Sequence, residues 1–298
     1  MYNISCTKYP YVSVIIPVFN DQDGVDNCLA SLSEQTWPKN NYEVIVVDNS
    51  SIPSIRITKE FSDFSRIVSC AKLGAYSARN AGINASHGEV LAFTDADCIP
   101  SNNWIETGFL SLISLGSHCI IGGKVNLELS QRPNTIEHYQ CLSGFMQQEN
   151  IEKLGFSVTA NMFTTRLQFQ RVGMFDESLF SCGDREWCWR AKKFGYFILY
   201  RPEVEVSTLP RRSLNSAIRQ VRRVAGGRHA LLGMEDSYID RACIKSHRSR
   251  WSATKWIFTH PDISAWKKVR VFCVVAILKV FELIEKIRLH TGSTAERF

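Results

Sequence analysis

The sequence lacks the features that define several protein classes. It has no apolar run of the ~20 residues that cross a bilayer as a helix, no internal repeat and no low-complexity tract. Its ten cysteines include no Cys-x-x-Cys pair, which argues against a zinc site and against a disulfide framework. It has no zinc-finger spacing and no aromatic-rich RNA-binding motif, so nucleic acid is not an expected partner.

The N-terminal segment also lacks a secretion signal. Residues 1–10 contain no basic start followed by an apolar stretch and a cleavage site. The scattered cysteines fit buried free thiols of a reducing compartment. We therefore expect a cytoplasmic protein, peripheral on the inner face of the membrane if its basic tail binds lipid.

Composition and charge are those of a protein with a large core. Hydrophobic residues make up 45% of the 298 residues and charged residues 21%, which is ordinary for a soluble protein. The net charge of +6 is uneven, because basic residues gather after residue 210. That distribution suits an anionic partner such as a diphosphate or a membrane surface.

Short apolar runs alternate with amphipathic segments. Strands are expected at residues 12–17, 43–48, 66–70, 89–93, 118–125, 158–165 and 196–206. Helices are expected after Asp21 and at residues 74–85, 104–115, 187–194 and 213–232. Residues 131–154 show no clear period, and a flexible loop with short helices is expected there. The alternation predicts an α/β fold with a Rossmann-like, mostly parallel sheet and flanking helices.

Carboxylates follow the ends of two predicted strands. Asp48 ends the strand at 43–48, and Asp95 and Asp97 follow the apolar run at 89–93. In an open α/β sheet the carboxyl ends of the strands form the ligand crevice. A close carboxylate pair there needs a cation or hydrogen-bond donors to neutralise it. Mg²⁺ or Mn²⁺ suits such a pair, because it prefers oxygen ligands and shares them with substrate phosphates.

Four motifs occur in a distinctive order: VIIPVFN (14–20), VVDNSS (46–51), ARNAG (78–82) and FTDAD (93–97). In this order they resemble the family-2 glycosyltransferases of the GT-A fold. The resemblance extends through GMFDE (173–177) and GDREWCWR (183–190), and it covers residues 12 to about 230. It implies an inverting, metal-dependent transferase. Such an enzyme moves a sugar from a nucleoside-diphosphate sugar, with UDP as the expected nucleotide, to a saccharide or lipid-linked acceptor in polysaccharide or glycoconjugate synthesis.

The resemblance also implies residues that bind the nucleotide-sugar. The backbone at Pro17 and Val18, together with Asp48 and Arg79, would hold the nucleobase. A carboxylate only accepts hydrogen bonds and suits an imide N–H, whereas a guanidinium suits a carbonyl or a phosphate. Asp95 would contact the ribose or the metal. From the residues alone, Asp48 could instead cap a turn, and Arg79 could be a charge on a helix surface.

The metal and the general base are implied in the same way. Asp97, with Asp95, would bind Mg²⁺ or Mn²⁺, and Asp184 would deprotonate the acceptor hydroxyl. Gly183 replaces an acid that the family usually carries, and Glu186 stands in place of a following Asp. Glu186 is thus a second candidate base, although its helical position favours a helix cap or an ion pair. Trp187 could stack on an acceptor sugar or pack on the sheet.

The sequence departs from the family in the region after residue 200. Thr208 lies where relatives often carry a histidine, which puts metal or diphosphate coordination from that side in doubt. Arg223, and with it Arg228, could contact the diphosphate, but the pattern favours a solvated basic helix face. The tail at 266–289 lies outside the resemblance, and it reads either as a helix on an anionic membrane or as a packed C-terminal helix.

These features predict a transferase domain over residues 1–232, with a nucleotide-sugar part at 12–125 and an acceptor part at 126–232. A helical extension follows at 233–298, with a possible membrane role. The alternative is a catalytically inactive nucleotide-sugar-binding or scaffold protein on the same fold. A phosphatase of the dehalogenase type fits poorly, because its Asp-x-Asp follows the first strand and this one follows the fourth.

Overall fold

The computed structural model describes residues 10–114, 118–245 and 264–295. The predicted absence of a secretion signal concerns residues that lie outside these ranges, apart from Pro10. Contacts divide the chain into two compact units, one of residues 1–126, 147–178 and 183–208, the other of 127–146, 179–182 and 209–298. The division into nucleotide-sugar and acceptor parts stays a prediction.

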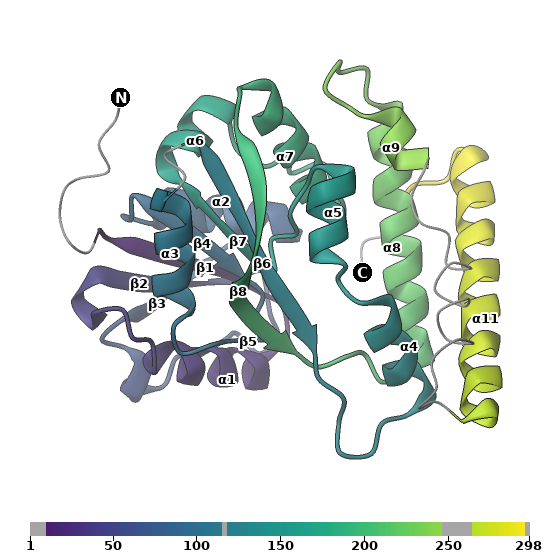
Figure 1. Cartoon of the computed structure of the whole chain (residues 1–298), viewed down its shortest axis with the longest axis horizontal. Helices are drawn as coiled ribbons and strands as arrows, with labels where there is room; N and C mark the ends of the chain where they lie inside the picture. Colours follow the sequence, from purple (N-terminus) through teal and green to yellow (C-terminus); the bar gives the residue numbers. More distant parts are fainter. Residues whose placement is uncertain (1–9, 115–117, 246–263, 296–298) are drawn as a thin grey trace. The chain divides into compact units, whose positions relative to one another are not determined.

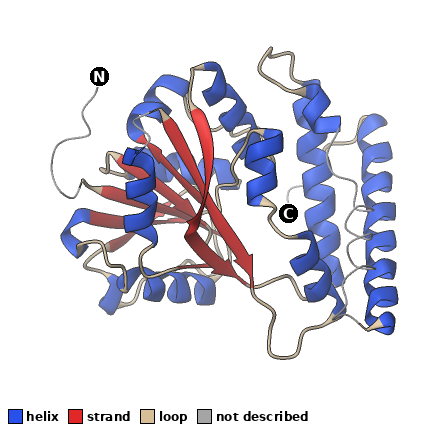
Figure 2. Cartoon of the chain, viewed as in Figure 1, coloured by secondary structure: helices blue, strands red, loops and turns tan. Residues whose placement is uncertain are grey.

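An eight-stranded sheet forms the core of the first unit (Figure 2). Its strands are β1 (Val12–Val18), β2 (Tyr42–Asp48), β3 (Ser65–Ser69), β4 (Val90–Thr94), β5 (Cys98–Pro100), β6 (Cys119–Leu127), β7 (Asn161–Thr165) and β8 (Phe197–Thr208). The spatial order is β3-β2-β1-β4-β7-β6-β8-β5, and neighbours among β1 to β4 run parallel. Strand β7 is antiparallel to β4 and β6, and β5 is antiparallel to β8. The predicted α/β class is confirmed, with antiparallel pairs confined to the later strands.

Helices flank this sheet and continue into the C-terminal region (Figure 1). They are α1 (Gln22–Ser33), α2 (Ala75–Ala85), α3 (Trp104–Ser114), α4 (Thr135–Ser143), α5 (Gln147–Leu154), α6 (Arg166–Val172), α7 (Gly183–Lys193), α8 (Leu214–Gly233), α9 (Arg241–Lys245) and α11 (Ala265–His290). Two 3₁₀ turns, η1 (Lys39–Asn41) and η2 (Lys59–Phe61), flank β2 in the sequence. None of the helices in the described ranges is long and apolar enough to cross a membrane.

The approach of α2 to the sheet depends on Gly82. A Cβ atom at this position would lie 2.6 Å from Cγ2 of Ile15 in β1 and 3.0 Å from Cγ2 of Val47 in β2. Real side chains do not come that close, so only glycine lets this helix pack against those strands. The close packing fixes the face of α2 that carries Arg79.

Residues 131–154, expected to be a loop with short helices, form α4 and α5. Asn134 caps α4, since its side chain accepts the backbone N–H groups of Ile136 and Glu137 while Glu137 returns a bond to the N–H of Asn134. Thr165 and Gln168 cap α6, a helix that the sequence pattern did not predict, in the same reciprocal way. Such capping boxes stabilise helices that are too short to show a clear period.

The second unit is a helical cluster. Eight buried side chains from α4, α8 and α11 form its core: Ile136, Tyr139, Ala217, Val221, Val271, Val274, Val275 and Leu278. Glu285 of α11 is buried and pairs with Arg222 at 2.9 Å and with Arg288 at 2.6 Å. One face of the tail helix therefore packs within this unit, as the packed-helix reading expected.

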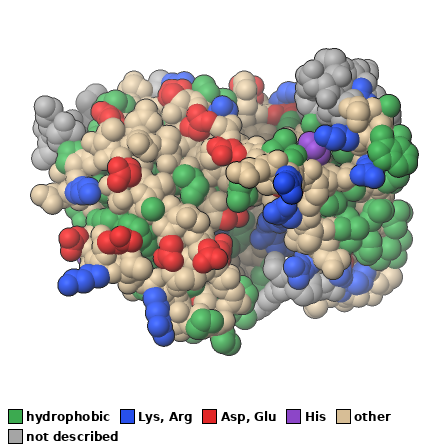
Figure 3. All heavy atoms as spheres, turned by 90° about the horizontal axis from the view of Figure 1, so that it is seen from below, with side chains coloured by type: hydrophobic (Ala, Val, Ile, Leu, Met, Phe, Trp, Pro, Cys, Tyr) green, Lys and Arg blue, Asp and Glu red, His purple; other side chains and the backbone are tan. Residues whose placement is uncertain are grey.

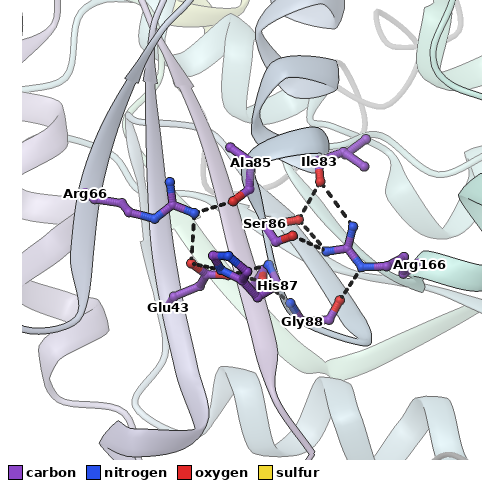
Figure 4. Close-up of polar contacts among 9 residues, drawn as sticks. Glu43, Arg66, Ile83, Ala85, Ser86, His87, Gly88 and Arg166 are labelled. Atoms are coloured by element: carbon purple, nitrogen blue, oxygen red, sulfur yellow. Dashed lines mark hydrogen bonds and ion pairs between the residues drawn. The ribbon is translucent and has the colours of Figure 1, made fainter.

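A polar cluster ties the amino ends of the central strands together (Figure 4). The buried carboxylate of Glu43 accepts the hydroxyl of Ser13 at 2.7 Å and the backbone N–H of His87 at 2.6 Å, and it pairs with Arg66 at 3.2 Å. Beside it, Arg166 of α6 donates to the carbonyl oxygens of Ser86 at 2.7 Å and Gly88 at 2.9 Å. Side chains thus satisfy the backbone where α2 ends and β4 begins.

Replacing Glu43 should lower stability in a pH-dependent way. Burial raises the pKa of the Glu43 carboxyl, but hydrogen bonds from His87 and Ser13 and the nearby Arg66 outweigh burial and hold the pKa below its usual value. A lowered folded-state pKa adds stability above the unfolded pKa, and this stability is lost as the pH falls through the folded pKa. We expect Glu43→Gln to cost about 1–3 kcal/mol near neutral pH and progressively less below about pH 4. Urea unfolding across this pH range measures it, and a pH-independent cost would contradict it.

Candidate functional site

Asp48 ends β2 beside the end of β1. Val18 of β1 is in register with Asp48, and Pro17 is in register with Val47. The Asp48 carboxylate is buried and accepts the backbone N–H groups of Ser51 at 2.9 Å and Ile55 at 3.1 Å. Burial raises the pKa of this carboxyl, but the bonds from Ser51 and Ile55 outweigh it and hold the pKa below its usual value. Asp48 is therefore ionised at neutral pH, and its carboxylate holds the backbone of the loop that follows β2.

Arg79 and Asp95 form an ion pair at the carboxyl end of β4. Nη2 of Arg79 lies 2.5 Å from Oδ1 of Asp95. The Arg79 side chain is 6% exposed and that of Asp95 is 34% exposed, so the arginine is not a charge on the helix surface. The pair brings together two predicted nucleotide-sugar residues from α2 and from the end of β4.

Asp97 lies on the turn between β4 and β5. The residue is exposed, and its backbone is held by the hydroxyl of Thr208, which donates to the carbonyl oxygen of Asp97 at 2.8 Å. Thr208, where relatives often carry a histidine, is 4% exposed and supports the Asp97 backbone. The side chain at position 208 therefore holds the backbone of the acidic turn, whereas a histidine at this position would be able to bind a metal.

The acidic turn fits a metal that takes most of its ligands from elsewhere. The described residues contain no group of three or more His, Cys, Asp and Glu side chains able to hold a metal by themselves. Asp95 and Asp97 still offer oxygen atoms at a strand end, and Mg²⁺ or Mn²⁺ commonly binds one or two carboxylates plus phosphate oxygens and water. The residues present fit a divalent metal that arrives with a diphosphate.

Asp184 lies at the start of α7 and faces Tyr76 of α2. The Tyr76 hydroxyl donates to Oδ1 of Asp184 at 3.3 Å, and the backbone N–H of Arg185 donates to the same oxygen at 2.9 Å. Burial raises the pKa of the Asp184 carboxyl above its usual value, although the Arg185 N–H, the charges of Arg79 and Arg185 and the Tyr76 hydroxyl act in the opposite direction. A carboxylate with a raised pKa is suited to take up a proton.

Tyr76 also explains the glycine at position 183. A Cβ atom on Gly183 would lie 2.7 Å from Cε2 of Tyr76. The ring thus occupies the space that a side chain at 183 would need, so the usual acid cannot fit there without moving the tyrosine. Sequence reasoning missed Tyr76, although its three-residue spacing from Arg79 on α2 places both on one helix face.

Glu186 and Trp187 face the protein interior. Glu186 is 2% exposed and binds Arg190 through both oxygens, at 2.8 and 3.0 Å. Trp187 is 0% exposed, stacks on Phe169 with ring centroids 4.4 Å apart and donates its Nε1–H to the carbonyl oxygen of Gly173. The expected roles of Glu186 as a second base and of Trp187 as an acceptor platform do not agree with this burial, so both residues are assigned to packing.

Arg223 lies on α8 in the second unit and is partly exposed. Its neighbour Arg222 pairs with Glu285, and Arg228 lies 3.9 Å from Glu282. These pairs hold α11 against α8 within that unit. The diphosphate role of Arg223 stays a prediction.

Known proteins resemble this chain in sequence. The glycosyl transferase family 2 model matches residues 13–171. The chain is 34% identical over 223 residues to the glycosyltransferase AglE of Haloferax volcanii, covering 73% of each chain. The chain belongs to glycosyl transferase family 2. It is therefore a glycosyltransferase that acts on nucleotide-sugar donors.

Other relatives of the family extend the picture. The chain is 23% identical over 225 residues, 70% of each chain, to the dolichyl N-acetyl-α-D-glucosaminyl phosphate 3-β-D-2,3-diacetamido-2,3-dideoxy-β-D-glucuronosyltransferase of Methanococcus voltae. The mannosyltransferase PcManGT of Pyrobaculum calidifontis, solved with GDP-Man and Mn²⁺, has the same fold. Its TM-score is 0.61 at 16% identity over 96% of this chain and 89% of that one. The GT-A fold of this chain is thus shared with solved members.

Proposed function

We propose that the chain is an inverting transferase that moves a sugar from a nucleoside-diphosphate sugar, UDP-linked as the first choice, to a lipid-linked or saccharide acceptor. The observation that carries it is that Arg79 links two acidic sites. Arg79 pairs with Asp95 at the strand end that also carries Asp97, and its charge acts on a second carboxylate, Asp184, whose pKa is raised by burial. In-line displacement needs one charged group for the leaving diphosphate and a separate base for the attacking hydroxyl. Both halves come from the first unit.

On the donor side, the backbone at Pro17 and Val18 and the buried Asp48 hold the nucleobase, and the buried Arg79 orients Asp95 toward the ribose. Asp97, with Asp95, would hold Mg²⁺ or Mn²⁺. Bound there, the metal supplies charge neutralisation for the departing diphosphate. A metal-bearing solved relative supports this proposal.

On the acceptor side, Asp184 accepts the proton of the attacking hydroxyl. Tyr76 and the Arg185 N–H hold one carboxylate oxygen in place, which leaves the other oxygen, Oδ2, to take the proton. The acceptor oxygen then bonds to the anomeric carbon from the side opposite the diphosphate, whose bond to that carbon breaks, and this displacement inverts the stereochemistry. A lipid-linked acceptor is favoured because one relative is named for transfer to a dolichyl-linked sugar phosphate, which points to glycoconjugate synthesis.

A thermal-shift screen of UDP-, GDP- and dTDP-sugars with Mn²⁺ tests the donor, because a bound ligand raises the melting temperature in proportion to its affinity. We expect UDP-sugars to give the largest rise, and the donor so found is then assayed for transfer with membrane lipid extracts. A scaffold protein on the same fold would bind the nucleotide but transfer no sugar. An equal response to all nucleotides would contradict the proposed donor preference.

We also infer that α11 lies on an anionic membrane. Its outward face exposes seven large apolar side chains: Trp266, Val269, Ile277, Val280, Leu283, Ile284 and Ile287. Exposed Lys267 and Arg270 lie at the same end of the helix as Trp266, and Figure 3 shows green and blue side chains close together on the right, where α11 runs. Apolar residues flanked by cations bind the interface of acidic lipids.

Sedimentation with liposomes tests this membrane face. Wild-type protein should sediment with liposomes rich in acidic lipid at low salt, and Val280→Glu/Ile284→Glu should stay in the supernatant. Leu110→Glu, at an apolar residue of α3 that is 50% exposed, is the matched control and should sediment like wild type. Concentration-dependent dimers that the double variant abolishes, without lipid binding, would assign the face to a second copy of the chain instead.

A further inference from the structure

Arg185 carries a buried charge that lacks a partner. The residue is 3% exposed. Its Nε and Nη1 atoms are buried and have no hydrogen-bond partner among the described residues, and no described carboxylate forms an ion pair with it. A buried charge is costly unless it is paired. Buried polar groups are otherwise satisfied, so an unsatisfied guanidinium calls for an acceptor, which a water, an ion or a ligand can supply.

The surroundings of Arg185 hold the guanidinium in place without neutralising it. Its Cζ lies 4.2 Å from the ring centroid of Phe156 and 5.6 Å from that of Trp189. Trp189 is itself fixed, since its Nε1–H donates to the carbonyl oxygen of Leu154 at 2.8 Å. Aromatic faces stabilise a cation modestly. They leave the N–H groups of the guanidinium free to donate to an acceptor that lies in the guanidinium plane. The planar guanidinium is thus preorganised to donate to two oxygen atoms of one oxyanion.

The neighbouring carboxylate does not fill this role. The charge of Arg185 lowers the pKa of Asp184. The Asp184 carboxylate, however, accepts its hydrogen bonds from the Tyr76 hydroxyl and from the backbone N–H of Arg185. Glu186, the next acid along α7, is held by Arg190. The Nε and Nη1 groups of Arg185 therefore remain available next to the proposed base in the sequence.

We propose that Arg185 binds an oxyanion of the acceptor, a phosphate or a carboxylate, close to the hydroxyl that Asp184 deprotonates. This inference rests on the proposed function, because it places the acceptor at Asp184. The donor diphosphate is assigned to the acidic strand end at Asp95 and Asp97, a different set of residues. Arg185 thereby selects acceptors that carry an anionic group near the reacting hydroxyl.

Binding is tested with Arg185→Met, which keeps an apolar stem against Phe156 and Trp189 but removes the charge. Inorganic phosphate should raise the melting temperature of the wild type more than chloride of equal ionic strength does, and Arg185→Met should lose this excess. Glucuronate in place of phosphate distinguishes a sugar carboxylate from a phosphate. Arg171→Met is the control, since Arg171 is exposed on α6, and it should respond like wild type.

Two results would overturn the proposal. An excess phosphate response that survives in Arg185→Met, with a lower melting temperature in the absence of phosphate, would give Arg185 a packing role. A wild-type response that disappears once UDP and Mn²⁺ saturate the protein would assign the oxyanion to the donor. Without ligand, the variant should melt at or above wild type, because an unpaired buried charge is gone.

Kinetics separate this inference from the proposed function. For acceptors bearing a phosphate or a carboxylate, Arg185→Met should raise KM about tenfold or more, and its KM for the donor should match wild type. An unchanged KM for anionic acceptors would contradict the inference. If the wild type transfers no sugar at all, the proposed function fails, and the melting experiment still reports whether Arg185 binds an oxyanion.

Discussion

Asp184→Asn should reduce sugar transfer by about 10²–10⁴-fold, the usual contribution of a positioned acid or base. The amide keeps an oxygen for the bonds from Tyr76 and the Arg185 N–H, but it cannot take a proton. KM for the donor should not change, because the donor residues lie elsewhere in the first unit. Single-turnover transfer with a radiolabelled donor measures the effect, and transfer within tenfold of wild type would remove Asp184 from the role of base.

The pH profile and stability give independent checks on the same residue. The pKa of Asp184 is raised by burial, so wild-type kcat/KM should rise with pH through a value above that of an ordinary aspartate. A raised folded-state pKa gives stability that is fully present below the unfolded pKa and is lost as pH rises through the folded pKa. Asp184→Asn should therefore be at least as stable as wild type near neutral pH, which separates lost chemistry from lost folding.

Tyr76→Phe should have a smaller effect than Asp184→Asn on the same site. It removes one hydrogen bond to Asp184 and keeps the ring that fills the space beside Gly183. A charged hydrogen bond contributes about 1.5–3 kcal/mol, so transfer should fall about ten- to hundredfold. In the Asp184→Asn background the same change should cost much less, since residues that act together are not additive.

Asp97→Ala should reduce transfer about 10³-fold, because a metal held there would supply several kcal/mol of charge stabilisation to the leaving diphosphate. Chelation with EDTA should reduce wild-type transfer to the same level, and Mn²⁺ should restore the wild type but not the variant. The backbone of Asp97 is held by Thr208, so the substitution removes the carboxylate without releasing the turn.

Asp63→Ala is the matched control for Asp97→Ala. Asp63 is an exposed carboxylate of the first unit, and its removal changes the net charge by the same amount. It should keep both wild-type transfer and the wild-type Mn²⁺ dependence. Undiminished transfer by Asp97→Ala, or full wild-type activity in EDTA, would argue for a metal-independent enzyme in which cationic side chains neutralise the diphosphate.

The buried parallel strands could be predicted because local chemistry dictates them. Strands β1, β2 and β4 are continuous apolar runs that end in polar turns, and the parallel register places Val18 beside Asp48. The acidic strand ends followed directly from this pattern. The short helices α4 and α6 carried a readable signal in their capping boxes, but their apolar period is too short to stand out.

Residues that depend on contacts between distant elements could not be predicted. Trp187 and Glu186 are residue types that often line binding sites, but both side chains face the protein interior. Trp187 stacks on Phe169 of α6, and Glu186 pairs with Arg190 in the next turn of α7. In the sequence, Gly183 stands where the family carries an acid. In the structure, the ring of Tyr76, more than a hundred residues earlier in the chain, occupies the space that a side chain at position 183 would need. Burial and pairing of this kind arise only when helices pack.

The sequence by itself determined the family, the α/β architecture and the acidic turn at Asp95 and Asp97, because motif order and hydrophobic runs are local properties of the chain. The tertiary structure alone decided which charges are paired. It joined Arg79 to Asp95 and gave Asp184 a tyrosine partner, and it left Nε and Nη1 of Arg185 buried without a hydrogen-bond partner among the described residues. Desolvation and hydrogen bonding depend on what surrounds a group in three dimensions, and these forces determine the chemistry available at the site.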